Sequence, residues 1–345
     1  MECDWEYSPR MRFRFKPSLE QRSNLRAQLA RLQQPDGALD ILRPILPADF
    51  EPADVSSSVA SVHADRFVMQ AQVSSAAGKE RAYALKVYAD DIGQHIWAHA
   101  QNLAERLPLN HHGICLPIAY VPEERMLVFP WVEGRYLSEI VDDRKPELLR
   151  LAARIAADLH RLAIVPGERT TAQMLFDETR ARCDRLRARW PGTTAMIEPL
   201  MASLEESLAF LDPADPSPVH GDLAAGQFLW TGNQLVLLDL DMFGYTDPAY
   251  DAGHFLAQLK RRCLVDPKVR TLAPQWLGSF RESYLEAMPM VSLRNISFYR
   301  GMTLIRKIYT ICRREPARWP QLVPKLANHA RQALQEVASP DLHAP

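Results

Sequence analysis

Hydrophobic and polar positions follow two different periods along the chain. Up to about residue 132, short apolar runs alternate with polar turns. Arg66–Val73 and Arg81–Tyr88 flank the polar loop SSAAGKE, and the later runs ICLPIAYV and MLVFPWV are separated by PEER. Apolar runs bounded by turn residues predict β-strands, here mostly antiparallel, with one helix between them at Ile92–Leu107. This part is therefore predicted to be rich in β-structure.

The N-terminal 57 residues are predicted to form an extension ahead of this sheet. MRFRFK, at 11–16, alternates apolar and basic residues and indicates a short strand. Leucines at helical spacing predict a helix over 19–32, and a Ser-x-x-Gln capping box precedes it. Residues 35–57 contain four prolines and are predicted to be an irregular connection.

Beyond Glu133-Gly134 the period becomes helical. Residues 146–164 carry a wide apolar face and predict a long helix. Further helical patterns cover 171–189, 195–211, 249–264, 275–287, 292–313 and 322–338. Only 216–247 breaks into short strand-like runs and loops.

The two patterns predict an α+β fold with a boundary near Val132–Ser138. We expect a β-rich N-lobe at 58–132 and a helical C-lobe at 133–345.

Composition narrows the functional classes. The chain has 345 residues, 47% of them hydrophobic and 24% charged, as in ordinary globular proteins. The formal charge of −1 gives no global electrostatic case for nucleic acid or an anionic membrane. No apolar run has the length of a transmembrane helix, the charged N-terminus does not resemble a signal peptide, and the five scattered cysteines fit reduced thiols. We expect a cytoplasmic protein without nucleic-acid or membrane partners, and no motif assigns a protein partner.

The residues that can carry chemistry gather in 216–247. The segment HGDLAAGQFLW contains Asp222 and Gln227, a TGNQ turn follows, and LVLLDLD then supplies Asp239. Two apolar runs joined by a tight turn predict a hairpin, which brings its two ends together. The carboxylates of Asp222 and Asp239 can then converge, and Gln227 can add an amide oxygen.

Such a set of oxygens suits a hard cation such as Mg²⁺. A carboxylate that does not bind the metal can accept a proton from a hydroxyl group. Base, amide ligand and carboxylate ligand on a strand–loop–strand unit are the catalytic half of a protein-kinase-type phosphotransferase. Asp241 would share a strand face with Asp239 and either assist the metal or be a solvated or structural acid.

The motifs HGDLAAGQFLW, LVLLDLD and DPAYDAGHFLAQL resemble the signature region of the aminoglycoside phosphotransferase and choline kinase-like superfamily. AYALKVYAD, VFPWVEG and ADLHRL extend the resemblance over most of residues 60–315. It implies a protein-kinase-like bilobal fold whose lobes hold ATP at a hinge near Val128–Glu133. The N-lobe at 58–132 would bind the nucleotide, and the C-lobe at 133–345 would carry the catalytic loop and the acceptor site. It also implies a kinase that moves the γ-phosphoryl group of ATP, bound with Mg²⁺, to a hydroxyl group of a small molecule.

The resemblance also implies residue roles. Asp222 matches the catalytic base, His220 the residue that braces the catalytic loop, and Asp239 the metal-binding aspartate. Asp251 matches a later, usually structural aspartate. Lys86 matches the lysine that holds the α- and β-phosphates; the alternative is a lysine on an edge strand whose ammonium group reaches solvent.

Several positions depart from the superfamily pattern. Gln227 stands where Asn is usual, as in the maltokinase branch, and still offers an amide oxygen. Thr246 replaces a glycine. The serine-rich stretch 54–61 stands where a glycine-rich loop would cover the phosphates. After Lys86, only Glu105 is available as an ion-pair partner, and it lies near the end of its helix.

Two other functions stay open. A catalytically silent nucleotide-binding or scaffold protein would account for these departures. A metal-dependent phosphoesterase would use His220, Asp222 and Asp239, but it needs further ligands that the sequence does not show. His254 is predicted to be a packed helix residue rather than a ligand. The acceptor is a sugar, an amino alcohol or an aminoglycoside-like molecule. The basic residues of 281–330 favour a neutral or anionic acceptor, unless they lie on outer helix faces.

Overall fold

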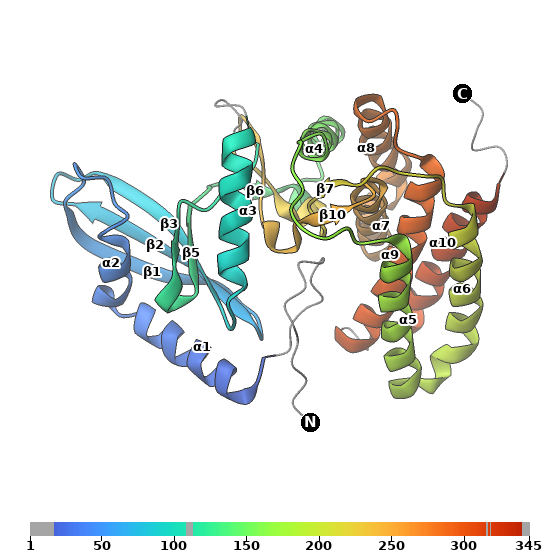
Figure 1. Cartoon of the computed structure of the whole chain (residues 1–345), viewed down its shortest axis with the longest axis horizontal. Coiled ribbons are helices and arrows are strands. Elements are labelled where there is room, and N and C mark those ends of the chain that lie inside the picture. The colour runs from blue at the N-terminus through green and yellow to red at the C-terminus, as the bar shows by residue number, and fades with distance from the viewer. Residues whose placement is uncertain (1–16, 108–112, 315–316, 318, 340–345) are drawn as a thin grey trace. The chain divides into compact units, whose positions relative to one another are not determined.

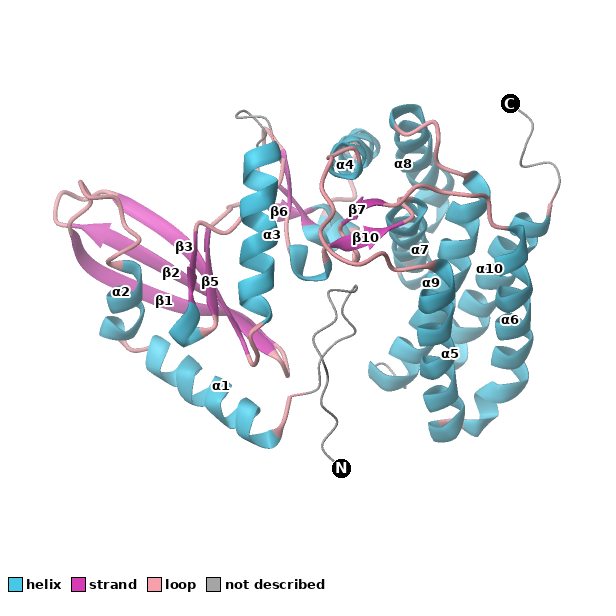
Figure 2. Cartoon of the chain, in the orientation of Figure 1, coloured by secondary structure: helices cyan, strands magenta, loops and turns pink. Residues whose placement is uncertain are grey.

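The computed structural model describes residues 17–107, 113–314, 317 and 319–339. It divides the chain into two compact units, which meet in sequence between Gly134 and Arg135 (Figure 1). The long strands belong to the N-terminal unit and most helices to the C-terminal unit (Figure 2), so the predicted α+β class is confirmed. The strand predicted at 11–16 lies outside the described residues.

A five-stranded antiparallel sheet forms the N-terminal unit. Its strands are β1 (Pro52–Val62), β2 (Arg66–Ser75), β3 (Glu80–Tyr88), β4 (Ala119–Val121) and β5 (Met126–Pro130). Their spatial order is β1-β2-β3-β5-β4, and every neighbouring pair is antiparallel. The predicted SSAAGKE hairpin joins β2 to β3. β3 is a central strand, because it lies between β2 and β5.

Helices cover both faces of this sheet. They are α1 (Leu19–Leu32), α2 (Pro35–Leu42) and α3 (Ile92–Arg106). Leu32 and Leu42, from α1 and α2, belong to one buried cluster with Leu85. Ile96 of α3 belongs to another with Tyr88. Since side chains alternate between the faces of a strand, Leu85 and Tyr88 point to opposite sides of β3.

The prediction of an irregular connection at 35–57 holds only for 43–51, because the first and last of its four prolines begin elements rather than interrupt them. Pro35 is the first residue of α2, where a missing N–H costs no intrahelical hydrogen bond. Pro52 is the first residue of β1, an edge strand on which an absent donor is tolerated. The extension therefore shares its core with the sheet.

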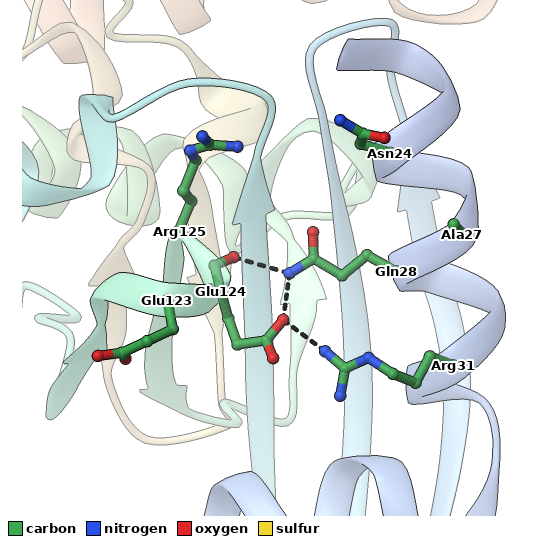
Figure 3. A pocket seen from close by; sticks show the side chains of 7 residues that line it. All are labelled: Asn24, Ala27, Gln28, Arg31, Glu123, Glu124 and Arg125. Carbon is green, nitrogen blue, oxygen red and sulfur yellow. Dashed lines mark hydrogen bonds and ion pairs between the residues drawn. The ribbon is translucent and has the colours of Figure 1, made fainter. Parts of the chain in front are cut away.

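Polar contacts cap the start of helix α1 and attach its last turns to the sheet. At its start the predicted capping box forms: Ser18 Oγ accepts from the Gln21 N–H, and Gln21 Oε1 accepts from the Ser18 N–H. Towards its end, Gln28 and Arg31 both donate to the Glu124 carboxylate, at 2.6 and 2.5 Å (Figure 3). Glu124 belongs to the turn between β4 and β5, so this cluster ties α1 to the sheet.

The C-terminal unit is a helical assembly. Its helices are α4 (Lys145–His160), α5 (Ala172–Arg189), α6 (Thr194–Ser207), α7 (Ala249–Val265), α8 (Ala273–Ala287), α9 (Leu293–Arg314) and α10 (Trp319–Ala338). They agree with the predicted helical segments to within a few residues. Helix α9 packs against α5, α6, α7 and α10, and α7 packs against α8.

Four short strands interrupt the helices within 216–247, where the sequence predicts them, and one further strand, β6, precedes α4. β6 (Arg135–Tyr136), β8 (Phe228–Trp230) and β9 (Leu235–Leu237) form one small sheet. β7 (Ser217–Val219) pairs with β10 (Gly244–Thr246). The β8–β9 pair is the predicted hairpin, although its strands are shorter than the apolar runs.

Two features hold α9 against its neighbours. At Gly253 of α7, an added Cβ would lie 2.7 Å from the Ile296 carbonyl oxygen, so glycine permits this close approach. Further along α9, the buried Arg306 donates to the Glu178 carboxylate at 2.8 Å and to Thr179 Oγ1 at 2.7 Å. These contacts bind α9 to α7 on one side and to α5 on another.

The described cysteines, Cys115, Cys183, Cys263 and Cys312, are buried and carry free thiols. Within the described ranges, no helix is both long and apolar enough to cross a bilayer.

Two helical glycines should respond oppositely to alanine. Gly253→Ala should destabilise the C-terminal unit by about 1–3 kcal/mol, because its Cβ meets backbone that cannot move away. Gly278→Ala should instead stabilise by up to about 1 kcal/mol, because its Cβ meets only the flexible Glu282 side chain and alanine favours a helix. Denaturant unfolding of both variants measures this. Equal effects would contradict the close packing of α7 on α9.

Candidate active site

Residues 220–227 form a loop between β7 and β8, which we call the HGD loop. Strand β7 holds its start by pairing with β10, and β8 holds its end by pairing with β9. Two small sheets thus fix both ends of the loop, and β9 leads directly towards Asp239.

The carboxylate of Asp251, in the first turn of α7, binds the start of the HGD loop. It is fully buried. Its Oδ2 accepts the backbone N–H of His220 at 2.6 Å, and its Oδ1 accepts that of Gly221 at 3.0 Å. His160 Nε2 lies 3.1 Å from Oδ2. Burial alone would raise the pKa of Asp251, but the hydrogen bonds and the histidines outweigh it and lower the pKa. Asp251 is therefore an ionised anchor for the loop.

His220 is also fully buried and connects the HGD loop to β9. Its Nε2 lies 2.8 Å from the Leu238 carbonyl oxygen, and its Nδ1 lies 3.3 Å from the Asp222 backbone nitrogen. A carbonyl oxygen only accepts and a backbone N–H only donates, so the proton of this imidazole is on Nε2. The imidazole therefore holds the backbone of Asp222 close to Leu238.

Gly221 allows the sharp turn of the loop. Its φ is +83°, and an added Cβ would lie 2.1 Å from the Met242 carbonyl oxygen. Both the backbone conformation and the lack of space exclude a side chain here.

The hairpin brings Gln227 and Asp239 together, as the sequence predicts. The Leu238 N–H donates to the Gln227 carbonyl oxygen at 2.7 Å, and Gln227 Nε2 lies 3.4 Å from Asp239 Oδ2. Asp239 has a left-handed backbone, with φ +66°, which an aspartate tolerates better than most residues.

These two side chains fit a hard cation that is shared with a phosphate ligand. Carboxylate and amide oxygens are suitable donors, and Mg²⁺ is usually held by one or two protein oxygens together with substrate phosphates. The residues that the structure describes contain no group of three or more His, Cys, Asp or Glu able to hold a metal by themselves.

The prediction that Asp239 and Asp241 lie on one face of a strand is wrong. β9 ends at Leu237, and Leu240–Met242 form a 3₁₀ turn, so side chains no longer alternate with period two. Asp241 is half-buried in this turn. A shared strand face therefore does not place Asp241 beside Asp239 as a second metal ligand.

His254 is buried in its helix, as predicted, and it also contacts Asp222, which the sequence did not predict. His254 Nε2 lies 3.1 Å from Asp222 Oδ1, and the two side chains are 7% and 33% exposed. Burial by itself would raise the pKa of Asp222, but the hydrogen bond from His254 and the charge of Lys307 lower it to about 2. The carboxylate is thus ionised at neutral pH. The signal was available: His254 follows Asp251 by three residues and shares its helix face.

Lys86 lies in the interior of the N-terminal sheet. It pairs with Val68 of β2 and Leu127 of β5, so it is not on an edge strand. The side chain is 7% exposed, and its Nζ lies 5.5 Å from the centre of the Tyr88 ring. Glu105 is exposed near the end of α3, and within the described ranges the structure records no ion pair between it and Lys86.

The serine-rich stretch 54–61 is not a phosphate-covering loop. It lies within β1 and pairs with β2, and the turn between these strands is His63-Ala64-Asp65. A pocket of about 350 Å³ in the same unit is lined by α1 and the turn that contains Glu124 (Figure 3), and none of the predicted site residues lines it.

Comparisons with known proteins agree with this fold. A family model described as the phosphotransferase enzyme family matches residues 78–289. A search of curated protein sequences returned no match. A choline/ethanolamine kinase family protein from Mesorhizobium loti aligns over 92% of this chain and 95% of its own, with 13% identity and a TM-score of 0.55.

Two further solved structures are similar. An amicoumacin kinase in complex with AMP-PNP and Ca²⁺ covers 93% of this chain and 98% of its own, with 14% identity and a TM-score of 0.55. A macrolide 2'-phosphotransferase from Brachybacterium faecium covers 88% and 99%, with 16% identity and a TM-score of 0.52. At such identities the similarity establishes a common fold.

Gly221→Ala should disrupt the HGD loop. The new Cβ would collide with the Met242 carbonyl, so we expect a loss of stability of more than about 2 kcal/mol, beyond the roughly 1–2 kcal/mol of a left-handed alanine. Gly232→Ala is the control, because Gly232 also has positive φ but has open space around it. Denaturant unfolding compares the two. If both lose the same stability, the close contact with Met242 does not constrain the loop.

Proposed function

The chain belongs to the phosphotransferase enzyme family, and from this premise we propose that it transfers the γ-phosphoryl group of ATP to a hydroxyl group of a small molecule. The observation that carries the proposal is the geometry of the site: Asp222 lies on a loop that Asp251 and His220 brace, and the side chains of Gln227 and Asp239 meet at the adjoining hairpin. This is the arrangement that phosphoryl transfer requires of a protein.

In the proposed reaction Asp222 receives the proton of the acceptor hydroxyl. The hydroxyl oxygen forms a bond to the γ-phosphorus, the bond between that phosphorus and the β-phosphate oxygen breaks, and ADP leaves with the bonding electrons. A pKa of about 2 makes Asp222 a weak base. It is suited to orienting the hydroxyl and taking up its proton late, as a loose transition state allows.

The other residues position the phosphates. Gln227 and Asp239 would hold Mg²⁺, which neutralises negative charge on the phosphates when it is bound. We assign Lys86 to the α- and β-phosphates, on the basis of its burial in a central strand and the family resemblance. Glu105 is assigned as the ion-pair partner of Lys86, but it is exposed near the end of α3. Asp241 is assigned as a further metal ligand, and it lies in the 3₁₀ turn after Asp239. Both assignments rest on the sequence alone.

The surroundings of Asp222 bear on the acceptor. Lys307 of α9 lies near enough to lower the pKa of both Asp222 and His254. A positive charge beside the carboxylate disfavours a polycationic acceptor. This supports a neutral or anionic hydroxyl compound, such as a sugar or a phosphorylated small molecule, over an aminoglycoside.

Binding of nucleotide gives the first test. Saturating Mg²⁺·ATP should raise the melting temperature, since a ligand at 100 times its Kd stabilises the folded state by about 2.7 kcal/mol. Lys86→Met should reduce this shift. Lys79→Met should not, because Lys79 is an exposed turn residue of the same unit. Differential scanning calorimetry measures both. A wild-type curve that Mg²⁺·ATP leaves unmoved would refute the nucleotide assignment.

Substitution of the two aspartates tests the chemistry. Asp222→Asn cannot take up the proton, so kcat should fall by about 10²–10⁴-fold while Mg²⁺·ATP affinity stays near the wild-type value. Asp239→Asn removes a charge from the metal site, so it should weaken Mg²⁺ binding, and added Mg²⁺ should restore part of the rate. The measurement is kcat against Mg²⁺ concentration, with an acceptor found by screening a metabolite pool with labelled ATP.

The outcome separates the candidate functions. Rescue of Asp222→Asn by Mg²⁺, in place of Asp239→Asn, would reverse the two roles. A wild-type protein that binds Mg²⁺·ATP but phosphorylates nothing and hydrolyses no ATP would instead be a silent nucleotide-binding protein.

A further inference from the structure

The contact between His254 and Asp222 has no part in the reaction described so far. His254 lies on α7, one turn beyond the loop anchor Asp251, and its Nε2 is 3.1 Å from Asp222 Oδ1. The histidine is buried, whereas a third of the Asp222 side chain is exposed. A buried group therefore contacts one oxygen of a carboxylate that remains partly open to solvent.

The other contacts of His254 hold its ring in one orientation. Thr303 Oγ1 of α9 lies 3.4 Å from Nδ1, and the amide of Gln258 lies 3.2 Å from Nε2. The Tyr250 ring, on the same helix, is 6.0 Å away between centroids. Groups from two helices thus confine the imidazole, and its Nε2 points to Asp222.

The charge state of the pair follows from its surroundings. Burial lowers the pKa of His254, and the positive charge of Lys307 lowers it further, against the effect of Asp222 and Asp251. A neutral imidazole beside an ionised carboxylate must donate, because the carboxylate can only accept. Its proton is therefore on Nε2, and Nδ1 accepts from the Thr303 hydroxyl. The Gln258 amide, whose nitrogen is placed 3.2 Å from Nε2, must then present its oxygen to this N–H.

Resting on the proposed function, we propose that His254 is a positioning residue for phosphoryl transfer: its Nε2–H occupies Oδ1 of Asp222 and leaves Oδ2 to orient the acceptor hydroxyl and receive its proton. The two oxygens of the carboxylate then have different tasks. His254 also helps to keep Asp222 ionised, because a hydrogen bond to the anion offsets part of the cost of its burial.

The test compares His254→Leu with His254→Gln. Leucine removes the donor at similar volume, and kcat should fall by about 10–100-fold, the usual effect of removing a residue that orients a catalytic group, with little change in the KM for ATP. Glutamine retains an N–H of similar reach and should restore most of the rate. His329→Gln, on α10 and hydrogen-bonded to its neighbour Gln332, is the control and should behave as the wild type.

The pH dependence provides a readout that a structural role would not change. In the wild type, the acid limb of kcat/KM lies far below neutrality, because Asp222 ionises near pH 2. Without the His254 hydrogen bond, burial dominates and raises the pKa of Asp222, so the acid limb should move to higher pH in His254→Leu. The charged and titratable groups that otherwise face the pair, Lys307, His220 and Asp251, are unchanged in this variant.

A double-mutant cycle excludes a purely structural effect. In an Asp222→Asn background, His254→Leu should cause almost no further loss of kcat, because the group that it positions no longer acts as a base. Additive losses would refute the proposal. So would a His254→Leu variant with the wild-type rate and pH profile, or a His254→Gln variant as slow as the leucine variant. If His254→Leu does not fold, His254→Met, which also lacks a donor, takes its place in the rate, pH and double-mutant measurements. Absence of ATP turnover by the wild type refutes the proposed function itself, which distinguishes the two failures.

Discussion

The ionised, fully buried carboxylate of Asp251 is the constraint on which the site depends. Burying a charge is costly unless donors surround it, and here two of the donors are backbone N–H groups of the HGD loop. The loop must therefore adopt one conformation to satisfy this anion. That conformation places the His220 ring between the Leu238 carbonyl oxygen and the backbone N–H of Asp222. A single buried charge thus fixes the HGD loop to helix α7.

The same helix also carries His254, so α7 contacts the loop at two points. Asp251 holds the backbone at the start of the loop, and His254 contacts the side chain of Asp222. Helix α9 in turn supports α7 through the close approach at Gly253 and through Thr303. The precision of the site comes from packed helices, which hold a side chain more accurately than a loop alone.

The features that the sequence predicted well are those encoded locally. The capping box at Ser18, the helices of the C-terminal unit and the β8–β9 hairpin depend on short-range spacing, and the structure contains each of them. The proximity of Gln227 and Asp239 followed because a hairpin must bring its ends together. The Asp222–His254 contact was not predicted, because it depends on how α7 is rotated against the loop. The helix α2 was not predicted, because the effect of a proline depends on whether it begins or interrupts an element.

The left-handed backbone of Asp239 has a consequence for how this protein can diverge. Residues with a Cβ adopt this conformation at a cost that Asn and Asp bear best and that Gly avoids. Exchange of Asp239 for Asn needs a change of one nucleotide in the codon. It keeps the path of the backbone but removes the negative charge. Descendants that lose catalysis by this route would keep their fold, their hairpin and their sequence signature on either side. In such a lineage, an intact fold would say nothing about activity, and the residue at this one position would.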